Sequence, residues 1–348
     1  MKFSYILIVA CLLVLSTGCK QDFDVTADYK EVPVVYGLLN YTENIHYLRI
    51  QKGYLVDGNA LLAAGVPDSI YYSDDLTVKL QPLVNGTANG SPYILKKVDG
   101  DTLNPPLPKD SGVFAQSPNI LYRFTGFLDP AKKYRLEINN PASGKSITSE
   151  TALVRDFEIV VPTKASKLNL GTTNPTKLVF ANAENAGVYD LTVRFHYKEY
   201  NQSDNSLIGS KYVDIKLFQS LGIDFVDGNN VITDLSGEQI FRTLANNITA
   251  NANVYREFDI TKGMVFTYAA GGTDLARYLN AQAAQSGLVS NEALPVFTNI
   301  SDGVGLFSSR YIKSVDSVLI SNNGLDSLAC NPISQPLRFK NHNGVLCQ

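Results

Sequence analysis

The sequence predicts a mainly β protein built from two β-rich domains. Short apolar or alternating runs rich in Val, Ile, Tyr and Leu are separated by clusters of Gly, Asn, Asp, Pro and Ser, as strands are separated by turns. Hydrophobic residues make up 45 % of the 348 residues, with 16 Phe and 19 Tyr, which is enough for ordinary globular cores. That length exceeds what one core usually serves, so we expect two domains.

The first eighteen residues have the form of a secretory signal peptide. Lys2 supplies one positive charge, and an apolar run follows over residues 6–15. This run is shorter than the about 20 apolar residues that a membrane-spanning helix needs. Small residues then precede Cys19 in a pattern that resembles the lipobox of lipoprotein signal peptidase, although Ser16 stands where the lipobox usually has Leu. We therefore expect residues 1–18 to be a lipoprotein signal peptide and Cys19 to be lipidated.

The segment after the cysteine, residues 19–30, is polar and acidic and has the character of a tether. Acyl chains on Cys19 would bury several dozen CH₂ groups, at about 0.8 kcal/mol each, and would hold the protein to a membrane. In the Bacteroidota, an acidic segment directly after the lipidated cysteine resembles the signal that sends lipoproteins to the cell surface. We therefore expect a lipid-anchored protein of the outer membrane, displayed on the cell surface.

Residues 31–156 have the pattern of a sandwich of short strands. Asp129-Pro130 forms a proline turn, and Tyr134, Leu136 and Ile138 then alternate strictly with polar residues. This resembles the last hairpin of immunoglobulin or fibronectin-type sandwiches, with Tyr134 placed like the tyrosine of a tyrosine corner; an ordinary antiparallel hairpin is the alternative. The expected strands are 34–39, 46–50, 76–80, 93–98, 120–124, 134–138 and 146–151, with a proline break at 104–108.

Residues 157–348 are expected to form a second β-rich domain that carries two helices. Ser236 and Gln239 have the spacing of a capping box, and an apolar stripe follows it. Thr273 can cap a second helix that Gly287 would end. The expected strands are 157–162, 177–180, 188–197 and 212–218.

The cysteines indicate one possible disulfide. Of the four, Cys11 would leave with the signal peptide and Cys19 would be acylated, so Cys330 and Cys347 remain. In an oxidising compartment these two could pair and stabilise the fold by about 3 kcal/mol. The alternative is two unpaired thiols in a frayed tail.

No residue pattern indicates catalysis, a metal or a cofactor. The formal net charge is −3 and no Lys/Arg cluster is present, which argues against nucleic-acid binding. His46, His196 and His342 are far apart in sequence, and the acidic clusters at 99–101 and 224–229 fit turns better than calcium loops. There is no Gly-x-Ser-x-Gly motif. The absence of Trp weakens a glycan site, although Tyr could substitute for it.

Four segments resemble the Asp-Ser/Thr-apolar acceptor for O-glycosylation of exported proteins in the Bacteroidota. About one such match arises by chance in a chain of this composition, so modification is a side hypothesis that an intact-mass measurement tests. The segments are Asp68-Ser69-Ile70, Asp101-Thr102-Leu103, Asp316-Ser317-Val318 and Asp326-Ser327-Leu328.

Taken together, the lipobox, the opening 34–39, the hairpin that ends at Glu150-Thr151 and the late stretch 296–307 resemble a lipoprotein family of the Bacteroidota, a domain-of-unknown-function family. Its genes often lie near TonB-dependent outer-membrane receptors. The resemblance implies a non-enzymatic binding or accessory partner of such a receptor. The alternative is a glycan-binding or glycan-processing surface lipoprotein. A broad apolar patch would favour the first, and a cleft with exposed Tyr and paired carboxylates the second.

Overall fold

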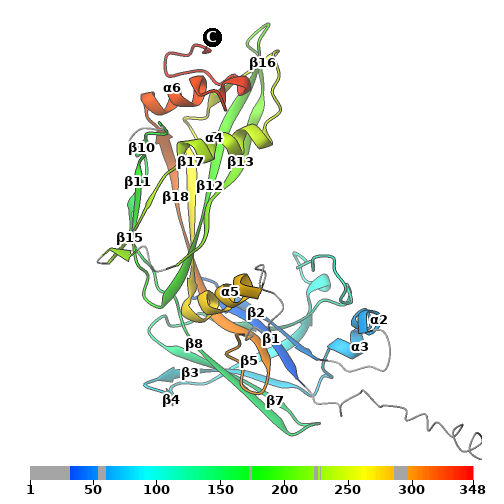
Figure 1. The fold of residues 1–348 in the computed structure, drawn as a ribbon. Coiled ribbons are helices and arrows are strands. Elements are labelled where there is room, and N and C mark those ends of the chain that lie inside the picture. The colour runs from blue at the N-terminus through cyan, green and yellow to red at the C-terminus, as the bar shows by residue number, and fades with distance from the viewer. Residues whose placement is uncertain are drawn as a thin grey trace, which may run out of the picture.

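The protein has two lobes joined by long strands (Figure 1). The computed structural model describes residues 32–53, 60–171, 175–222, 226–227, 229–285 and 297–347. Over these residues the fold is mainly β, as the sequence predicts. None of the helices in this part of the chain combines the length and apolar character that a membrane crossing requires. The expected signal peptide, the expected lipidation site Cys19 and the tether all lie outside the described residues.

The first lobe contains the strands from the N-terminal part of the chain. They are β1 (Pro33–Leu39), β2 (Ile45–Lys52), β3 (Thr77–Val84), β4 (Thr87–Ala88), β5 (Tyr93–Asp99), β6 (Ile120–Thr125), β7 (Lys133–Asn140) and β8 (Lys145–Ala152). Apart from the short β4, which pairs with β3, they hydrogen bond in the order β1-β2-β6-β5-β3-β7-β8, and neighbours are antiparallel. Every strand that the sequence predicts before residue 156 lies at its expected position. Two short helices, α2 (Ala60–Ala64) and α3 (Pro67–Ile70), project from this lobe (Figure 1).

The alternating pattern of β7 buries one face of the strand. Tyr134, Leu136 and Ile138 are each 1 % exposed and belong to the core of this lobe. The Tyr134 hydroxyl accepts a hydrogen bond from the amide N–H of Asp129 (2.7 Å) and donates to the carbonyl of the same residue (3.3 Å). The proline turn before the strand is thereby fixed to the strand that follows it.

The second lobe contains two sheets with a core between them. One sheet combines β12 (Ala186–Asn201), β13 (Leu207–Gly222), β16 (Val254–Phe258), β17 (Met264–Gly272) and the later part of β18 (Val304–Ile320). The other has the order β14-β15-β11-β9, from β14 (Val226–Asp227), β15 (Asn230–Asp234), β11 (Lys177–Ala181) and β9 (Ile159–Val161). A short strand, β10 (Lys167–Leu168), runs parallel to the end of β18.

Helix α4 (Gly237–Asn247) begins where the capping box predicts. The Ser236 side chain accepts a hydrogen bond from the backbone N–H of Gln239 (3.2 Å), and Ile240, Phe241 and Leu244 are fully buried. Helix α5 (Thr273–Gln285) has Thr273, the residue expected to cap it, as its first residue, whereas Gly287, its expected stop, lies outside the described residues.

The sequence predicts two helices after residue 157, and this is wrong, because the described residues contain three α-helices there. A third helix, α6 (Asn322–Cys330), follows β18 directly, capped by Ser321. The sequence does not predict α6 because Gly324, a poor helix former, lies in its first turn. A Cβ on Gly324 would lie 2.5 Å from the Cγ2 of Ile320, so the close packing of helix on strand requires glycine. A disulfide joins Cys330 at the end of α6 to Cys347, with Cα atoms 5.3 Å apart.

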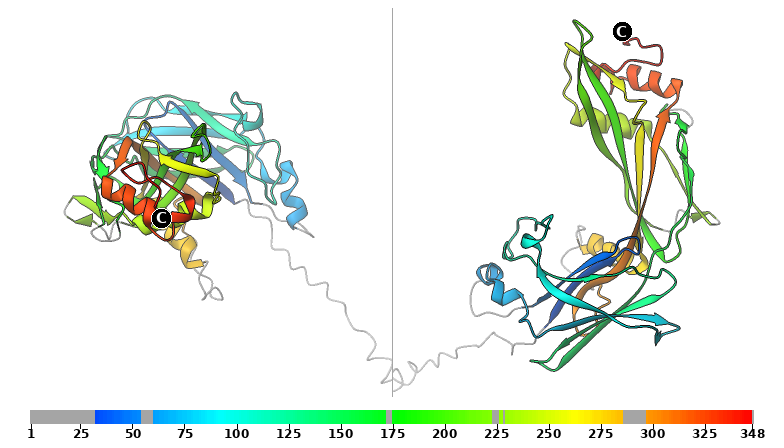
Figure 2. Two further views of the ribbon diagram at one scale, coloured as in Figure 1. Left: turned by 90° about the horizontal axis from the view of Figure 1, so that it is seen from above. Right: turned by 180° about the vertical axis from the view of Figure 1, so that it is seen from behind.

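The two lobes are joined by β18, which belongs to both. Its first residues run parallel to β1 in the first lobe, from the pair Val34–Val304 to the pair Leu39–Ser309. Its later residues pair with β17 in the second lobe. Figure 2 shows from behind that the strand continues from one lobe into the other. The division expected at 156/157 stays a prediction, and the first core takes in Ile300 and Phe307 from the end of the chain.

The glycines at 303 and 305 have different roles. The sequence predicts a tight turn over Gly303-Val304-Gly305, and the turn covers Ser301–Gly303 instead. Gly305 lies inside β18 with φ +115°, and a Cβ there would collide with the carbonyl oxygen of Val35. Glycine at this position therefore permits the close approach of β1.

Candidate functional site

The histidines do not come together. His46 is buried against Phe124 and its Nε2 lies 3.2 Å from the carbonyl oxygen of Gly126. His196 contacts the carbonyl of Gly263 on the second lobe, and His342 contacts Asp326 near the C-terminus. In the described part of the chain, no three His, Cys, Asp or Glu side chains are close enough together to hold a metal ion.

The acidic segment 99–101 forms a turn, as the sequence predicts. The Asp99 side chain accepts hydrogen bonds from the backbone N–H groups of Asp101 (3.1 Å) and Asn119 (3.0 Å), which is turn chemistry. Part of the segment 224–229 lies outside the described residues.

Of the four glycosylation-like segments, only the one at Thr102 has an exposed hydroxyl-bearing residue. Ser69, Ser317 and Ser327 are half-buried.

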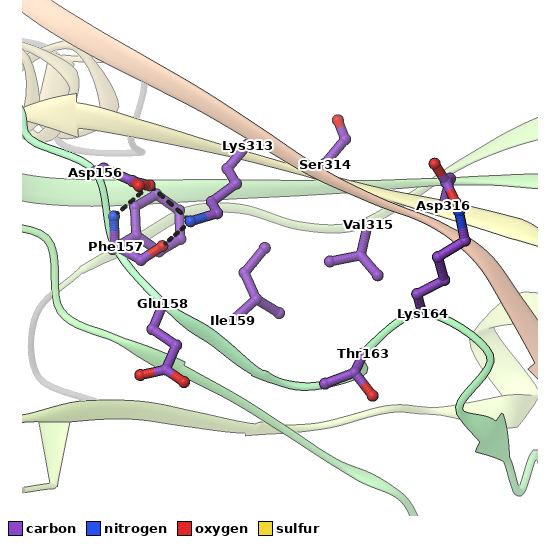
Figure 3. A pocket seen from close by; sticks show the side chains of 10 residues that line it. All are labelled: Asp156, Phe157, Glu158, Ile159, Thr163, Lys164, Lys313, Ser314, Val315 and Asp316. Carbon is purple, nitrogen blue, oxygen red and sulfur yellow. Dashed lines mark hydrogen bonds and ion pairs between the residues drawn. The ribbon is translucent and has the colours of Figure 1, made fainter.

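A cavity of about 550 Å³ lies between β9 and β18, and we call it the slot (Figure 3). Phe157, Ile159 and Val315 give it apolar walls. At one end the Lys313 ammonium donates to Asp156 Oδ1 (2.7 Å) and to the carbonyl oxygen of Phe157 (2.6 Å). At the other end Lys164 and Asp316 form an ion pair of 3.2 Å. The slot is thus an open groove with apolar side chains in its middle and an ion pair at each end.

Two carboxylates of the slot, Asp156 and Asp316, are held in the charged form. Burial acts to raise the pKa of Asp156, but hydrogen bonds from Lys313 and Tyr311 outweigh it and leave the pKa below its usual value. Hydrogen bonding to Ser317 and Lys164 lowers the pKa of Asp316 as well. A general acid at neutral pH needs a raised pKa, so these carboxylates suit binding better than proton transfer.

A second, polar cleft of about 660 Å³ lies between β12, β13 and the segment 247–251. At its base Glu199 is bound by Arg256, 2.9 Å away, and by Lys211, 2.6 Å away. Burial acts to raise the pKa of Glu199, but the hydrogen bonds from Lys211 and Arg256 outweigh it, so that the pKa lies below its ordinary value. Arg256 also donates to the carbonyl oxygens of Leu337 (2.6 Å) and Thr249 (3.0 Å). This arginine therefore connects the floor of the polar cleft to the C-terminal segment.

The opposite face of β12 and β13 from Glu199 and Lys211 carries an exposed aromatic ring. Tyr212 is 55 % exposed, and the guanidinium of Arg194 lies 4.1 Å from its ring centroid. Arg194 also binds Asp214 through two hydrogen bonds of 2.7 and 2.8 Å. Asn247, Thr249 and Asn251 add amide and hydroxyl groups to the polar cleft on the other face.

An exposed apolar patch lies on the first lobe at α2 and α3. It comprises Leu61, Leu62, Val66, Val113 and Phe114, with exposed fractions of 64, 72, 48, 56 and 45 %. The backbone N–H of Ala115 donates to the carbonyl oxygen of Ala64 (2.9 Å), which brings the two contributing segments together. Lys109 lies over the Phe114 ring at 5.7 Å. Several large apolar side chains gathered on one surface are typical of an interaction site.

Sequence reasoning did not find these surfaces. The slot combines residues 156–164 with residues 313–316, and only the folded chain shows that they are neighbours. The apolar patch could have been suspected, because Val113-Phe114 stands within a stretch rich in Ser, Gly, Pro and Asp where no strand is expected.

Comparisons with known proteins add little to this geometry. No protein-family model matches the chain, and no curated protein sequence matches it significantly. Among solved structures it is similar to the C-terminal globular domain of an oligosaccharyltransferase from Pyrococcus abyssi, at 10 % identity and a TM-score of 0.20. That alignment covers 64 % of this chain and 41 % of the other. A likeness of this size carries no argument about fold or function.

Proposed function

We propose that the protein is a lipid-anchored, non-enzymatic protein of the outer membrane, displayed at the cell surface, that acts as an accessory partner of a TonB-dependent receptor. In this proposal Cys19 carries the lipid, and the chain belongs to the lipoprotein family of the Bacteroidota that it resembles. The observation that carries the binding role is the apolar patch. Monomeric proteins rarely leave such side chains together in water without a partner.

The position of the apolar patch supports a role near the membrane. The backbone N–H of Gly53 donates to the carbonyl oxygen of Val32 (2.7 Å), so the end of β2, which leads into α2, lies beside the first described residue. Val32 follows Cys19 by 13 residue steps, which can span at most about 45 Å. A receptor in the same membrane would therefore be within reach of the patch.

The immunoglobulin-like fold of the first lobe is part of the same proposal. The hydrogen bonds between Tyr134 and the backbone of Asp129 support it, because a tyrosine corner joins a tyrosine hydroxyl to the backbone a few residues upstream. An experimental structure of the mature protein tests the strand connections.

The receptor proposal is tested by capture from the native host. The lipidated protein is crosslinked on intact cells, purified and compared with the variants Leu62→Glu and Phe114→Glu. We expect a TonB-dependent receptor to copurify with the wild type and to be lost with both variants. Ile260→Glu, which changes a 70 % exposed side chain on the second lobe, is the control. Protease added to intact cells should also cleave the protein, because it is displayed at the surface. Protection from this protease, or equal capture of the receptor by all four proteins, would contradict the proposal.

A glycan-binding role is the second candidate, and the outer face of β12 and β13 around Tyr212 favours it. Exposed Tyr212 offers the stacking surface that sugars use, and His196 and Asp214 on the same face can make hydrogen bonds. Because Asp214 is bound by Arg194, this face supports binding better than glycoside cleavage. Tyr212→Ala should abolish binding on a glycan array, while Tyr36→Ala, which changes an exposed tyrosine in β1, should leave it unchanged. A glycan signal that survives Tyr212→Ala would exclude this face.

A further inference from the structure

One edge of strand β13 has no neighbouring strand. β13 is the last strand of the large sheet (Figure 1), and in the described part of the chain only β12 pairs with it. It has 16 residues, whereas strands usually have about 3–10. An edge of this length presents a row of backbone N–H and C=O groups to which another strand can bind.

The open part of this edge is the segment 207–215. Further along the strand, the side-chain amide of Gln239 donates to the carbonyl oxygens of Lys216 (3.0 Å) and Leu217 (2.9 Å), so α4 covers the edge there. From Gly209 to Lys216, β13 pairs with β12 without a change of register. Because no bulge twists this part of the edge away, it keeps the regular spacing that a further strand needs.

The polar cleft lies along the same open edge. Its lining includes the four consecutive residues Lys211–Asp214, whose side chains alternate between the two faces of the sheet. The cleft therefore reaches the edge of β13, where the two faces meet. Asn247, Thr249 and Asn251 line it from the segment after α4 and offer amide and hydroxyl groups to a backbone that lies there.

The charges of the polar cleft favour an acidic occupant. Lys211 and Arg256 carry two positive charges against the one negative charge of Glu199, which both of them bind. Asp214 lies on the opposite face and is bound by Arg194. The Lys211 side chain is 54 % exposed, whereas those of Arg256 and Glu199 are buried. An acidic side chain on a strand added to β13 would lie beside Lys211, on the same face of the sheet.

We propose that the polar cleft binds an extended, acidic peptide segment of a partner protein, which adds to the open edge of β13 as a further strand. The peptide backbone exchanges hydrogen bonds with residues 207–215, and its acidic side chain contacts Lys211. Leu207 and Ile208, which are 55 and 54 % exposed, give apolar contacts at the start of the strand. The apolar patch lies on the other lobe, so the inference does not depend on the lipid anchor or on a receptor.

Fluorescence anisotropy of labelled synthetic peptides with the mature protein tests the proposal. The probe is an eight-residue peptide of alternating Val and Thr in which one central Thr is replaced by Asp. We expect it to bind with a Kd of about 0.1 mM or tighter. Two further peptides carry N-methyl groups on the odd or on the even amides. At least one of them should bind about tenfold more weakly, because a methylated amide cannot donate to β13.

Hydrogen exchange with the Asp peptide present locates the site. The backbone amides of residues 207–215 should exchange more slowly, because the added strand protects them. Failure of the Asp peptide to bind, full affinity of both methylated peptides, or slowed exchange that leaves residues 207–215 unchanged would overturn the proposal.

The acidic side chain is tested by a second pair of changes. Replacement of the Asp of the probe by Asn should weaken binding about two- to fivefold, the effect of one pair of opposite charges on neighbouring strands. Lys211→Met, which keeps the pair of Arg256 and Glu199, should abolish this difference between the two peptides. Lys216→Met is the matched control on the opposite face of β13 and should retain it. Equal preference for the Asp peptide in the wild type and in Lys211→Met would overturn the assignment of an acidic occupant.

Discussion

Removal of the Arg256 guanidinium should cost the protein more stability than any surface change in the same lobe. Arg256 is 3 % exposed and Glu199 is 6 % exposed. In Arg256→Met, Glu199 keeps only Lys211, whose side chain is 54 % exposed and screened by water. The carbonyl oxygens of Leu337 and Thr249 lose their charged donor as well. Breaking a buried ion pair in this way costs about 3–5 kcal/mol.

The assay is urea denaturation at pH 7 and 25 °C, followed by circular dichroism and by tyrosine fluorescence. Arg242→Met is the matched control, because Arg242 pairs with Glu238 on the exposed face of α4, with side chains 64 and 50 % exposed. Such a pair contributes about 0.3–0.5 kcal/mol. If Arg256→Met lost less than about 1 kcal/mol, the reasoning from burial would be refuted.

The ion pair of Arg256 and Glu199 makes the stability of the protein depend on pH. Because the folded pKa of Glu199 lies below its ordinary value of 4.5, its contribution to stability is complete above that pH and is lost as the pH falls through the folded pKa. In Glu199→Gln, that part of the acid sensitivity should disappear. A double variant with Arg256→Met should recover part of the loss of the single arginine variant, since no charge is then left buried alone.

Three further predictions follow from single contacts. Reduction of the Cys330–Cys347 disulfide, which closes a loop of sequence separation 17, should lower the free energy of unfolding by about 3 kcal/mol; a mass unchanged by reductant would show that the thiols are free. Ser236→Ala should cost about 1 kcal/mol through loss of the α4 cap, whereas Ser236→Asp, which keeps an oxygen acceptor, should cost much less in the same denaturation. Gly305→Ala should prevent correct pairing of β18 with β1 and give a protein that is cleaved faster by thermolysin than the wild type; equal cleavage rates would contradict it.

The sequence predicts the local elements well where one signal dominates. The alternation at Tyr134, Leu136 and Ile138 marks β7, and the spacing of Ser236 and Gln239 marks the start of α4. Both signals are contained within about ten residues, so no tertiary information is needed to interpret them.

The features that escape the sequence depend on partners far along the chain. The parallel pairing of β1 with β18 joins residues about 270 positions apart, and a lone sequence contains no trace of it. The Gly271-Gly272 pair at the end of β17 makes room for Leu275 and Ser308, which cannot be inferred before the crossing of the strands is known. The candidate surfaces were missed for the same reason, because each joins segments that only the fold brings together.

The strand shared by the two lobes has a mechanical consequence. With 17 residues at about 3.3 Å each, β18 is about 55 Å long and runs without a break from the first lobe into the second. Because β1 and β18 are parallel, pulling the chain before Pro33 in one direction and the far end of β18 in the other slides the two strands past each other. All the hydrogen bonds between them then share the load, whereas peeling would break them one at a time. A pulling force between the N-terminus and the second lobe therefore acts along the strands β1 and β18, the direction in which their pairing resists force best.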